Sequence, residues 1–251
     1  RVLFRSKTKL KTIRNRLSFL RSAIDEAVTD GLISDNPVAH ISASRYFSIE
    51  YGNTEEYEVD PFTPAEISII YMHCLYPQWK ATFQFALNTG VRPSELCALR
   101  WRDIDFERKT AFVQNAVVEG VEKSTKTRAG TRKIDLNEEA VEALSIMKQF
   151  TQLKIEFVFE DPRTGEPWAG SDAIRQKAWR IIMRESKLRY RNPYQTRHTF
   201  ATMHISSGAN LFWLCKQMGH KGPDMLFRNY GSYLVDYDGH LSRPTIKTGS
   251  E

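Results

Sequence analysis

The stretch ATFQFALNTGVRPSELCALRWRDIDFERKTAFV, residues 81–113, passes from one kind of secondary structure to another and so decides the fold class. It begins with an apolar helical run that ends in a turn at Gly90, and RPSELCAL restarts a helix after that turn. Over residues 101–136, β-branched and aromatic runs alternate with polar turns, which predicts a small antiparallel sheet of three strands. We expect KSTKTRAG, residues 123–130, to form the tip of a hairpin.

The segments on either side of this sheet have helical patterns. Thr63 is a predicted helix N-cap, with Pro64 at the first helical position and Glu66 at the spacing of a capping box. Beyond Asn137 the pattern is helical again. The sequence therefore predicts a mainly α fold with a small three-stranded antiparallel sheet, an α+β protein.

The chain divides into two parts at a polar segment. From Thr8 to Leu32, apolar residues recur every three or four positions, which predicts an amphipathic helix that ends at Gly31. A segment without sustained periodicity follows, and we interpret residues 42–60 as a linker between an N-terminal part, residues 1–41, and a main domain, residues 61–251. The N-terminal part is too small for a core of its own and begins without methionine, so we expect helices to precede it.

Composition excludes several classes of protein. With 41% hydrophobic and 26% charged residues, the chain has a globular composition. No apolar run approaches the ~18–20 residues that span a bilayer, and the N-terminus lacks the apolar core of a signal peptide, so we expect a cytoplasmic protein. The cysteines are odd in number and widely separated, which predicts neither a disulfide framework nor a zinc site.

Positive charge is concentrated at the N-terminus of a chain whose net charge is +6. A basic end of this kind suits a DNA backbone, although a solvated helix face explains it nearly as well. The candidate DNA contacts, from this end and from the expected hairpin, are Lys7, Lys9, Lys11, Arg14, Lys123 and Arg128.

A set of polar side chains suggests phosphoryl transfer. Each lies beside a turn or a helix end and has an ordinary structural explanation when taken alone, such as capping, solvation or core packing. Two arginines, a lysine, a histidine and a tyrosine are nevertheless the groups that transfer of a phosphate to a protein hydroxyl would use. These candidates are Arg92, Lys126, Arg197, His220 and Tyr230.

The chemistry assigns a role to most of these groups. Guanidinium groups bind the non-bridging oxygens of a phosphodiester bidentately, and a hairpin lysine can protonate the leaving 5′-oxygen. A phenol whose pKa is lowered by neighbouring arginines can attack the phosphorus and carry it covalently. The scheme needs no metal, and His198 and His204 are six residues apart, on different faces of a helix rather than at zinc-ligand spacing.

Four motifs in order, NTGVRPSELCALRWRDIDF, TKTRAGTRKIDL, YQTRHTFATMHISSG and QMGHKGPDMLFRNYGSYL, resemble the tyrosine recombinases, the phage-integrase family. The resemblance covers nearly all of residues 62–233. It implies a catalytic domain, residues 61–251, preceded by the C-terminal part of a helical core-binding domain, residues 1–41. It also implies strand exchange at attachment-site DNA by a homotetramer, through a Holliday junction, with accessory DNA-bending or directionality factors as further partners and no cofactor.

The resemblance also assigns residues. It makes Arg92 and Arg197 the phosphate-binding arginines, Lys126 the hairpin lysine, His220 the penultimate residue and Tyr230 the nucleophile, and these fall at the family's motif positions. At two further positions the chain matches or departs from the family's pattern. Glu95 matches an acidic position that orients the first arginine, and Tyr194 stands where the family commonly has histidine or lysine.

Tyr194 can hydrogen-bond a phosphate, but its phenol cannot readily accept the proton of Tyr230 at neutral pH. His198 directly follows Arg197 and so points to another side of the helix, and we interpret it as a packing or supporting residue in preference to a replacement base.

Two other functions remain open at this stage. A type IB topoisomerase would share the tyrosine and the arginines, and a non-catalytic relative would keep the fold as a DNA-binding module. The short motif spacing and the preceding helical part favour an integrase over a topoisomerase. The complete set of catalytic-type residues argues against a pure binding module.

Overall fold

The computed structural model describes residues 10–42, 59–124 and 130–238. The chain forms two compact units, residues 1–58 and 59–251. The second unit begins two residues before the predicted boundary at 61, because Val59 packs against a hydrophobic cluster of this unit and Asp60 binds Arg191.

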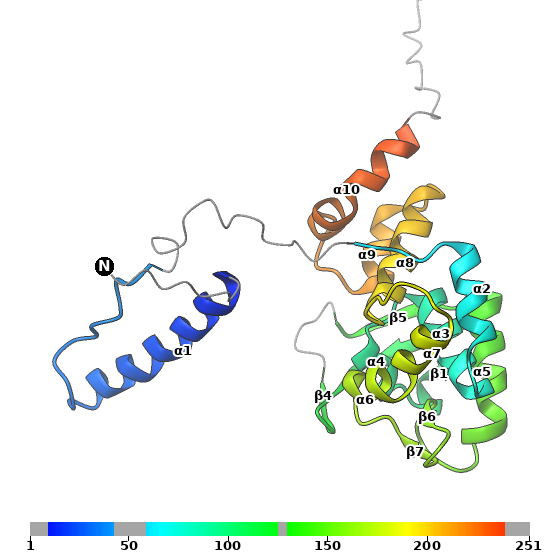
Figure 1. Cartoon of the computed structure of the whole chain (residues 1–251), viewed down its shortest axis with the longest axis horizontal. Coiled ribbons are helices and arrows are strands. Elements are labelled where there is room, and N and C mark those ends of the chain that lie inside the picture. Colours follow the sequence, from blue (N-terminus) through cyan, green and yellow to red (C-terminus); the bar gives the residue numbers. More distant parts are fainter. Residues whose placement is uncertain (1–9, 43–58, 125–129, 239–251) are drawn as a thin grey trace, which may run out of the picture. The chain divides into compact units, whose positions relative to one another are not determined.

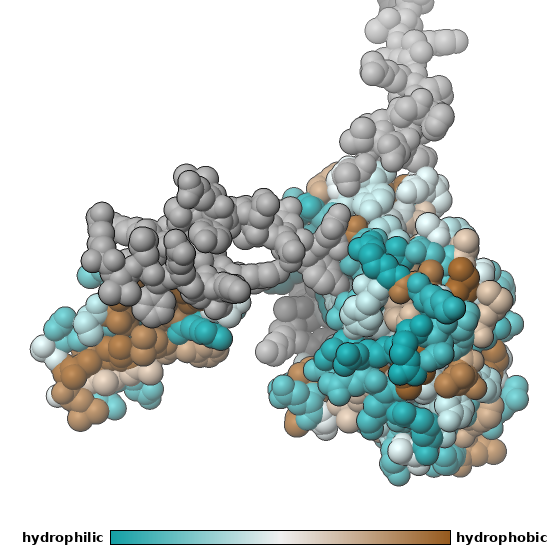
Figure 2. Space-filling model, viewed as in Figure 1, coloured by the Kyte–Doolittle hydropathy of each residue, from teal (hydrophilic) through white to brown (hydrophobic). Residues whose placement is uncertain are grey.

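The first unit contains helix α1, Leu10–Thr29, which ends just before the predicted stop at Gly31. Gly31 follows in the left-handed region with a φ of 70°. The segment after it folds back onto the helix, where Arg21 donates hydrogen bonds to the carbonyls of Val38 and Ile41. Hydrophobic side chains such as Phe19, 79% exposed, lie on the surface of α1, and Figure 2 shows them in brown along this helix.

The second unit is mainly helical (Figure 1). The predicted capping box at Thr63 is confirmed, since Thr63 Oγ1 accepts from the Glu66 amide at 3.2 Å and the Thr63 amide donates to Glu66 Oε2 at 2.9 Å. Its helices are α2 Pro64–Met72, α3 Pro77–Thr89, α4 Pro93–Ala98, α5 Glu138–Thr151, α6 Ser171–Ile174, α7 Arg180–Glu185, α8 Gln195–Ser206, α9 Leu211–Met218 and α10 Asp224–Asp238. A 3₁₀ turn at Trp101–Asp103 and a π-helical turn at Arg175–Trp179 complete the helical elements.

The strands are short and antiparallel. They are β1 Ile104–Asp105, β2 Thr110–Val113, β3 Asn115–Val118, β4 Val121–Ser124, β5 Arg132–Asp135, β6 Glu160–Asp161 and β7 Glu166–Pro167. One sheet has the order β1-β2-β5, and β3 with β4 and β6 with β7 form separate pairs.

The predicted hairpin tip needs a correction. β4 pairs with β3 in register Val118 with Val121, so the turn of that hairpin lies at Glu119 and Gly120. Both residues have positive φ. Lys123 and Ser124 therefore belong to a strand instead of a turn, and β5 pairs with β2. Residues 125–129, which include Lys126 and Arg128, lie outside the described part of the chain.

Two hydrophobic clusters form the core of this unit. The larger one includes Trp79, Phe83 and Trp179 and lies around α3, α5 and the sheets. The smaller one includes Phe200 of α8 and Tyr230 of α10. Helix α8 packs against both α3 and α10, so it connects the two clusters. The predicted fold class, mainly α with small antiparallel sheets, is confirmed.

None of the helices in the described ranges combines the length and the apolar character that a bilayer-spanning segment requires.

Candidate active site

The corner between α3 and α4 positions the first predicted arginine. Gly90 ends α3 with a φ of 65°, and a Cβ at this position would lie 2.4 Å from Cδ1 of Phe200, so the close packing of α8 requires glycine. Arg92 is the N-cap of α4. Glu95, one turn later, accepts hydrogen bonds from the Arg92 amide at 2.9 Å and from Arg92 Nη1 at 2.7 Å. The helix start and the guanidinium group are therefore fixed by one buried carboxylate.

A second guanidinium group binds the same carboxylate from the sheet. Arg132 of β5, 6% exposed, donates to Glu95 Oε1 at 3.1 Å and to Oε2 at 2.9 Å. Arg132 is not among the site residues predicted from the sequence. A signal was present, because strand alternation places it on the same buried face as Ile134, where an arginine needs a partner.

The third arginine, Arg197, lies in the first turn of α8 and is 1% exposed. Its Nη1 donates to the carbonyl of Gly90 at 2.5 Å and its Nη2 to the carbonyl of Met218 at 2.6 Å. The same Nη2 lies 2.9 Å from Nε2 of His220. Arg197 thus connects the end of α3, the end of α9 and the predicted histidine.

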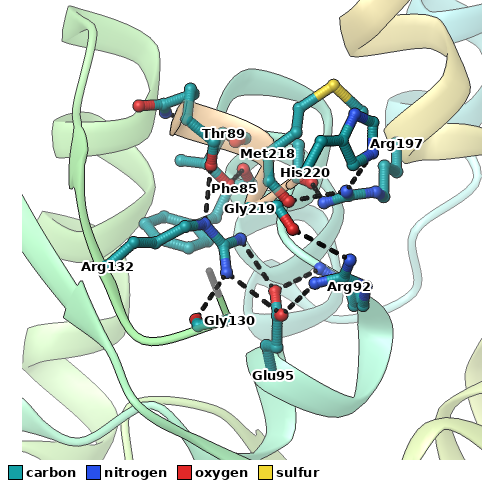
Figure 3. Close-up of polar contacts among 12 residues, drawn as sticks. Phe85, Thr89, Arg92, Glu95, Gly130, Arg132, Arg197, Met218, Gly219 and His220 are labelled. Atoms are coloured by element: carbon teal, nitrogen blue, oxygen red, sulfur yellow. Dashed lines mark hydrogen bonds and ion pairs between the residues drawn. The ribbon is translucent and has the colours of Figure 1, made fainter. Parts of the chain in front are cut away.

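All three guanidinium groups meet at the C-terminal end of α9 (Figure 3). Arg132 Nε donates to the carbonyl of residue 217 at 2.8 Å, Arg197 to that of residue 218, and Arg92 Nη2 to that of Gly219 at 3.4 Å. The last carbonyls of a helix lack partners within the helix and carry the negative end of its dipole. The helix end therefore helps to hold three positive charges close together.

We name this set, Arg92, Glu95, Arg132, Arg197 and His220, the arginine cluster. Burial alone would raise the pKa of Glu95, but hydrogen bonds and charge from Arg132, together with Arg92 and Arg197, lower it to about 2. Burial, followed by the charge of Arg92, lowers the pKa of Arg197 to about 10. At neutral pH the cluster therefore has an excess of positive charge.

His220 is neutral in this environment. Burial and then the charges of Arg197, Arg92 and Arg132 lower its pKa to about 3. Because a guanidinium group can only donate, Nε2 of His220 is the acceptor of the Arg197 hydrogen bond, and the ring proton resides on Nδ1. Nδ1 is buried and has no partner within the described residues.

Tyr194 lies beside the cluster at the start of α8 and is half-buried. Its phenol hydrogen-bonds Arg92, and together with Glu95 it helps to raise the pKa of that guanidinium against the effect of burial. The phenol can therefore reach a ligand of Arg92. Its ring centroid is 5.2 Å from that of His198.

Tyr230 joins the cluster through His198. Tyr230 is 1% exposed, and its Oη lies 2.7 Å from Nδ1 of His198. His198 is itself buried, and burial followed by the charge of Arg197 lowers its pKa to about 4. The sequence predicts that His198 faces another side of α8 than Arg197, and in the structure the predicted nucleophile, Tyr230, contacts His198 on that side.

The remaining predicted residues are the candidate DNA contacts and the hairpin lysine. Arg14 on α1 and Lys123 on β4 are exposed, as expected of side chains that could contact DNA. Lys7, Lys9, Lys126 and Arg128 lie outside the described residues, as does the side chain of Lys11. In the part that the structure describes, no group of His, Cys, Asp and Glu side chains has the arrangement of a metal site.

The arrangement suits an anion with several oxygens. Arg92 is the most exposed of the three guanidinium groups, with 32% of its side chain accessible, so it forms the solvent side of the cluster. The N–H groups of a planar guanidinium match the oxygens of a phosphate in geometry, and their hydrogen bonds to it are stronger where water is excluded. The cluster can therefore bind a phosphodiester, with a buried phenol one histidine away.

Known proteins of similar sequence come from one family. Residues 62–233 match the model of the phage integrase family. IntQ of Escherichia coli (strain K12), whose name marks it as a defective protein, is 30% identical over 90% of this chain and 61% of its own length. The prophage integrase IntR of the same organism is 28% identical over 90% of this chain and 58% of its own length. The chain thus spans about three fifths of the length of these relatives.

Solved structures match over most of the chain. The Tn1549 transposon integrase in complex with transposon right end DNA has a TM-score of 0.71 and 25% identity, covering 93% of this chain and 78% of that one. A lambda integrase tetramer bound to a Holliday junction has a TM-score of 0.61 and 22% identity, covering 92% and 61%. With the family model matching more than half of its residues, the chain belongs to the phage integrase family, the tyrosine recombinases.

Proposed function

We propose that the chain is part of a site-specific DNA recombinase that cleaves and rejoins DNA through a 3′-phosphotyrosyl intermediate. The observation that carries this proposal is the arginine cluster beside a buried tyrosine that is hydrogen-bonded to His198. The named relatives that bind transposon-end DNA and a Holliday junction support the same substrate class.

In this mechanism Arg92 and Arg197 hold the non-bridging oxygens of the scissile phosphate and stabilise the charge that develops on them. Tyr230 Oη gives up its proton to a base and bonds to the phosphorus, the bond to the 5′-oxygen breaks, and the 5′-oxygen takes a proton from Lys126. Tyr194 adds one hydrogen bond near Arg92. Religation is the reverse reaction, and the phosphotyrosyl bond conserves the energy of the broken phosphodiester.

DNA binding must rearrange part of this site. Tyr230 and Arg197 are each 1% exposed, and Nη1 and Nη2 of Arg197 each donate a hydrogen bond to a backbone carbonyl. A phosphate therefore has to compete with those carbonyls for Arg197, and the phosphorus has to come within reach of Tyr230 Oη. Carbonyls are weaker partners of a guanidinium than a charged phosphate, so this exchange is favourable.

We further propose the assembly that the family resemblance implies. Residues 1–41 form the end of a core-binding domain, and the chain acts as a homotetramer on synapsed attachment sites in the cytoplasm of a bacterial host. Accessory DNA-bending or directionality factors would act on the same complex. Arg14 and Lys123 are candidate backbone contacts because they are exposed and basic.

The test of the chemistry is covalent trapping on DNA. Nicked duplexes tiled across the DNA that flanks this gene are incubated with the wild type, Tyr230→Phe and Tyr233→Phe. Tyr233 is a matched control, since it lies on the same helix and loses the same hydroxyl. We expect an adduct from the wild type and Tyr233→Phe and none from Tyr230→Phe, with DNA binding retained in all three.

The alternatives give different results. DNA binding without an adduct in the wild type would indicate a non-catalytic relative, a possibility raised by the defective relative IntQ. Relaxation of supercoiled DNA without exchange between two sites would indicate a topoisomerase. An adduct that persists in Tyr230→Phe but not in Tyr233→Phe would move the nucleophile to Tyr233.

A further inference from the structure

We propose that His198 accepts the proton of Tyr230 during cleavage and returns it during religation, which rests on the proposed function. The feature behind this proposal is a hydrogen bond between two helices. His198 Nδ1 on α8 lies 2.7 Å from Tyr230 Oη on α10. The rings are 5.5 Å apart at 57°, so the imidazole meets the hydroxyl group instead of stacking on the ring.

Burial makes this contact well defined. His198 is 4% exposed and Tyr230 1%, and the helices that carry them pack against each other. A group within hydrogen-bonding distance of a proton is placed to serve as its general base. The phenol of Tyr230 and the imidazole of His198 are thus already arranged as donor and acceptor before DNA arrives.

The other groups of the site are poor acceptors for this proton. Nε2 of His220 already accepts from Arg197. Tyr194 is a phenol, and a neutral phenol is not a base at neutral pH. Among the described residues of the site, His198 is the histidine that directly contacts the nucleophile.

The charge of the site favours transfer when a phosphate is bound. In the free protein, burial and then the charge of Arg197 hold the pKa of His198 near 4, which keeps the ring neutral with one nitrogen unprotonated. A phosphodiester bound by Arg197 brings a negative charge that offsets that arginine. His198 therefore becomes a stronger base where the substrate is present, and it remains neutral in the free protein.

The proton balance of the step is complete. In cleavage the Tyr230 Oη–H bond breaks, Oη bonds to phosphorus, and the proton moves to Nδ1 of His198. The bond from phosphorus to the 5′-oxygen breaks, and that oxygen takes a proton from the general acid. In religation the 5′-hydroxyl returns its proton to the deprotonated general acid as it attacks the phosphorus, the tyrosine leaves, and the imidazolium returns its proton to Oη.

The first experiment compares single-turnover cleavage by the wild type, His198→Asn, His198→Ala and the control His204→Asn, which changes another histidine of α8. The duplex is the one on which the wild type forms its Tyr230 adduct. Asparagine keeps a polar group near the position of Nδ1 but cannot take a proton. We expect both His198 variants to bind DNA normally and to cleave about 10²-fold more slowly or worse, while His204→Asn stays near the wild type.

A modified substrate distinguishes a base from an acid. With sulfur in place of the bridging 5′-oxygen, the leaving group needs no proton, so the loss of a general acid is masked. We expect His198→Asn to remain slow on this substrate, and we expect free imidazole to restore part of the rate of His198→Ala. Recovery of His198→Asn to the wild-type rate on the sulfur substrate would overturn the proposal, as would an unchanged rate on ordinary DNA.

A measurement on the wild-type protein needs neither variants nor DNA. Nitrogen-15 NMR of the histidine rings reports which nitrogen carries the proton. We expect His198 to be neutral, with the proton on Nε2 and Nδ1 as a hydrogen-bond acceptor. A proton on Nδ1 would contradict the proposal even if the variants failed to fold. Failure of the wild type to form any Tyr230 adduct would instead refute the proposed function.

Discussion

Replacing Glu95 by glutamine tests how the arginine cluster is held together. Glu95 is 3% exposed and binds two guanidinium groups, with distances of 2.7 Å to Arg92 and 2.9 Å to Arg132. Glutamine has nearly the same shape but no charge. Glu95→Gln therefore leaves the packing in place and removes the charge that offsets the arginines.

The magnitude follows from the shift in pKa. The pKa of Glu95 falls from 4.5 to about 2. One pKa unit is worth about 1.36 kcal/mol, so the ionised carboxylate stabilises the fold by about 3 kcal/mol at neutral pH. Removing one partner of a buried ion pair costs about 3–5 kcal/mol, which is the same range. We expect Glu95→Gln to lower the free energy of unfolding by about 3 kcal/mol at pH 7.

Urea unfolding across pH is the assay. Because the folded-state pKa is depressed, the contribution of Glu95 is fully present above pH 4.5 and is lost as pH falls toward 2. The wild type and Glu95→Gln should therefore differ at pH 7 and converge in acid. Glu138→Gln is the control, since the pair of Glu138 with Lys109 is exposed and should cost under about 1 kcal/mol. A difference that is as large at pH 2.5 as at pH 7 would refute this reasoning.

Three further predictions follow from the site. Gly90→Ala should lower the free energy of unfolding by about 2–5 kcal/mol in thermal or urea unfolding, because it adds backbone strain and the ring clash described above. Gly120 has a φ of 75° and open space around it, so Gly120→Ala should show the cost of backbone strain alone. Equal losses of unfolding free energy in Gly90→Ala and Gly120→Ala would contradict the clash. The pKa values of His198, about 4, and His220, about 3, lie below the ordinary 6.5, so the unfolded chain binds more protons below that pH. Their contribution is present above pH 6.5 and is lost as pH falls toward 3. The free energy of unfolding should decrease by on the order of 2–3 kcal/mol between pH 6.5 and 4.5, a figure already halved for solvent screening. A free energy of unfolding that stays constant over this range would contradict the lowered histidine pKa values. Tyr194→Phe removes one hydrogen bond to a charged group, worth about 1.5–3 kcal/mol, so single-turnover cleavage should slow by about 10- to 10²-fold, and complete loss would make the phenol an essential proton carrier.

Local chemistry made several elements predictable. The capping box at Thr63, the turn at Gly90 and the restart of helix at Pro93 depend on residues within a few positions of one another, so their signals are readable in the chain. The strand pairing was harder. A run of β-branched residues shows where strands lie but does not choose between partners, and β4 pairs with β3 and not with β5.

The missed parts of the site depend on contacts between distant segments. Arg132 is buried because Glu95, 37 residues away, and the carbonyl of Gln217, 85 residues away, receive its donors. The helical period showed that His198 faces another side of α8, but it could not show that Tyr230 of α10 packs there. Both contacts exist only once the tertiary fold has formed.

The end of α9 has a consequence for how this sequence can change over evolution. Arg92, Arg132 and Arg197 bind the backbone carbonyls of residues 217–219, and every amino acid provides a carbonyl. Substitution at Met218 therefore alters packing but leaves the acceptor in place. Gly219, with a φ of 67°, is the position where the backbone itself limits the choice of residue. The electrostatic frame of the site can thus persist in relatives whose side chains at this helix end have diverged.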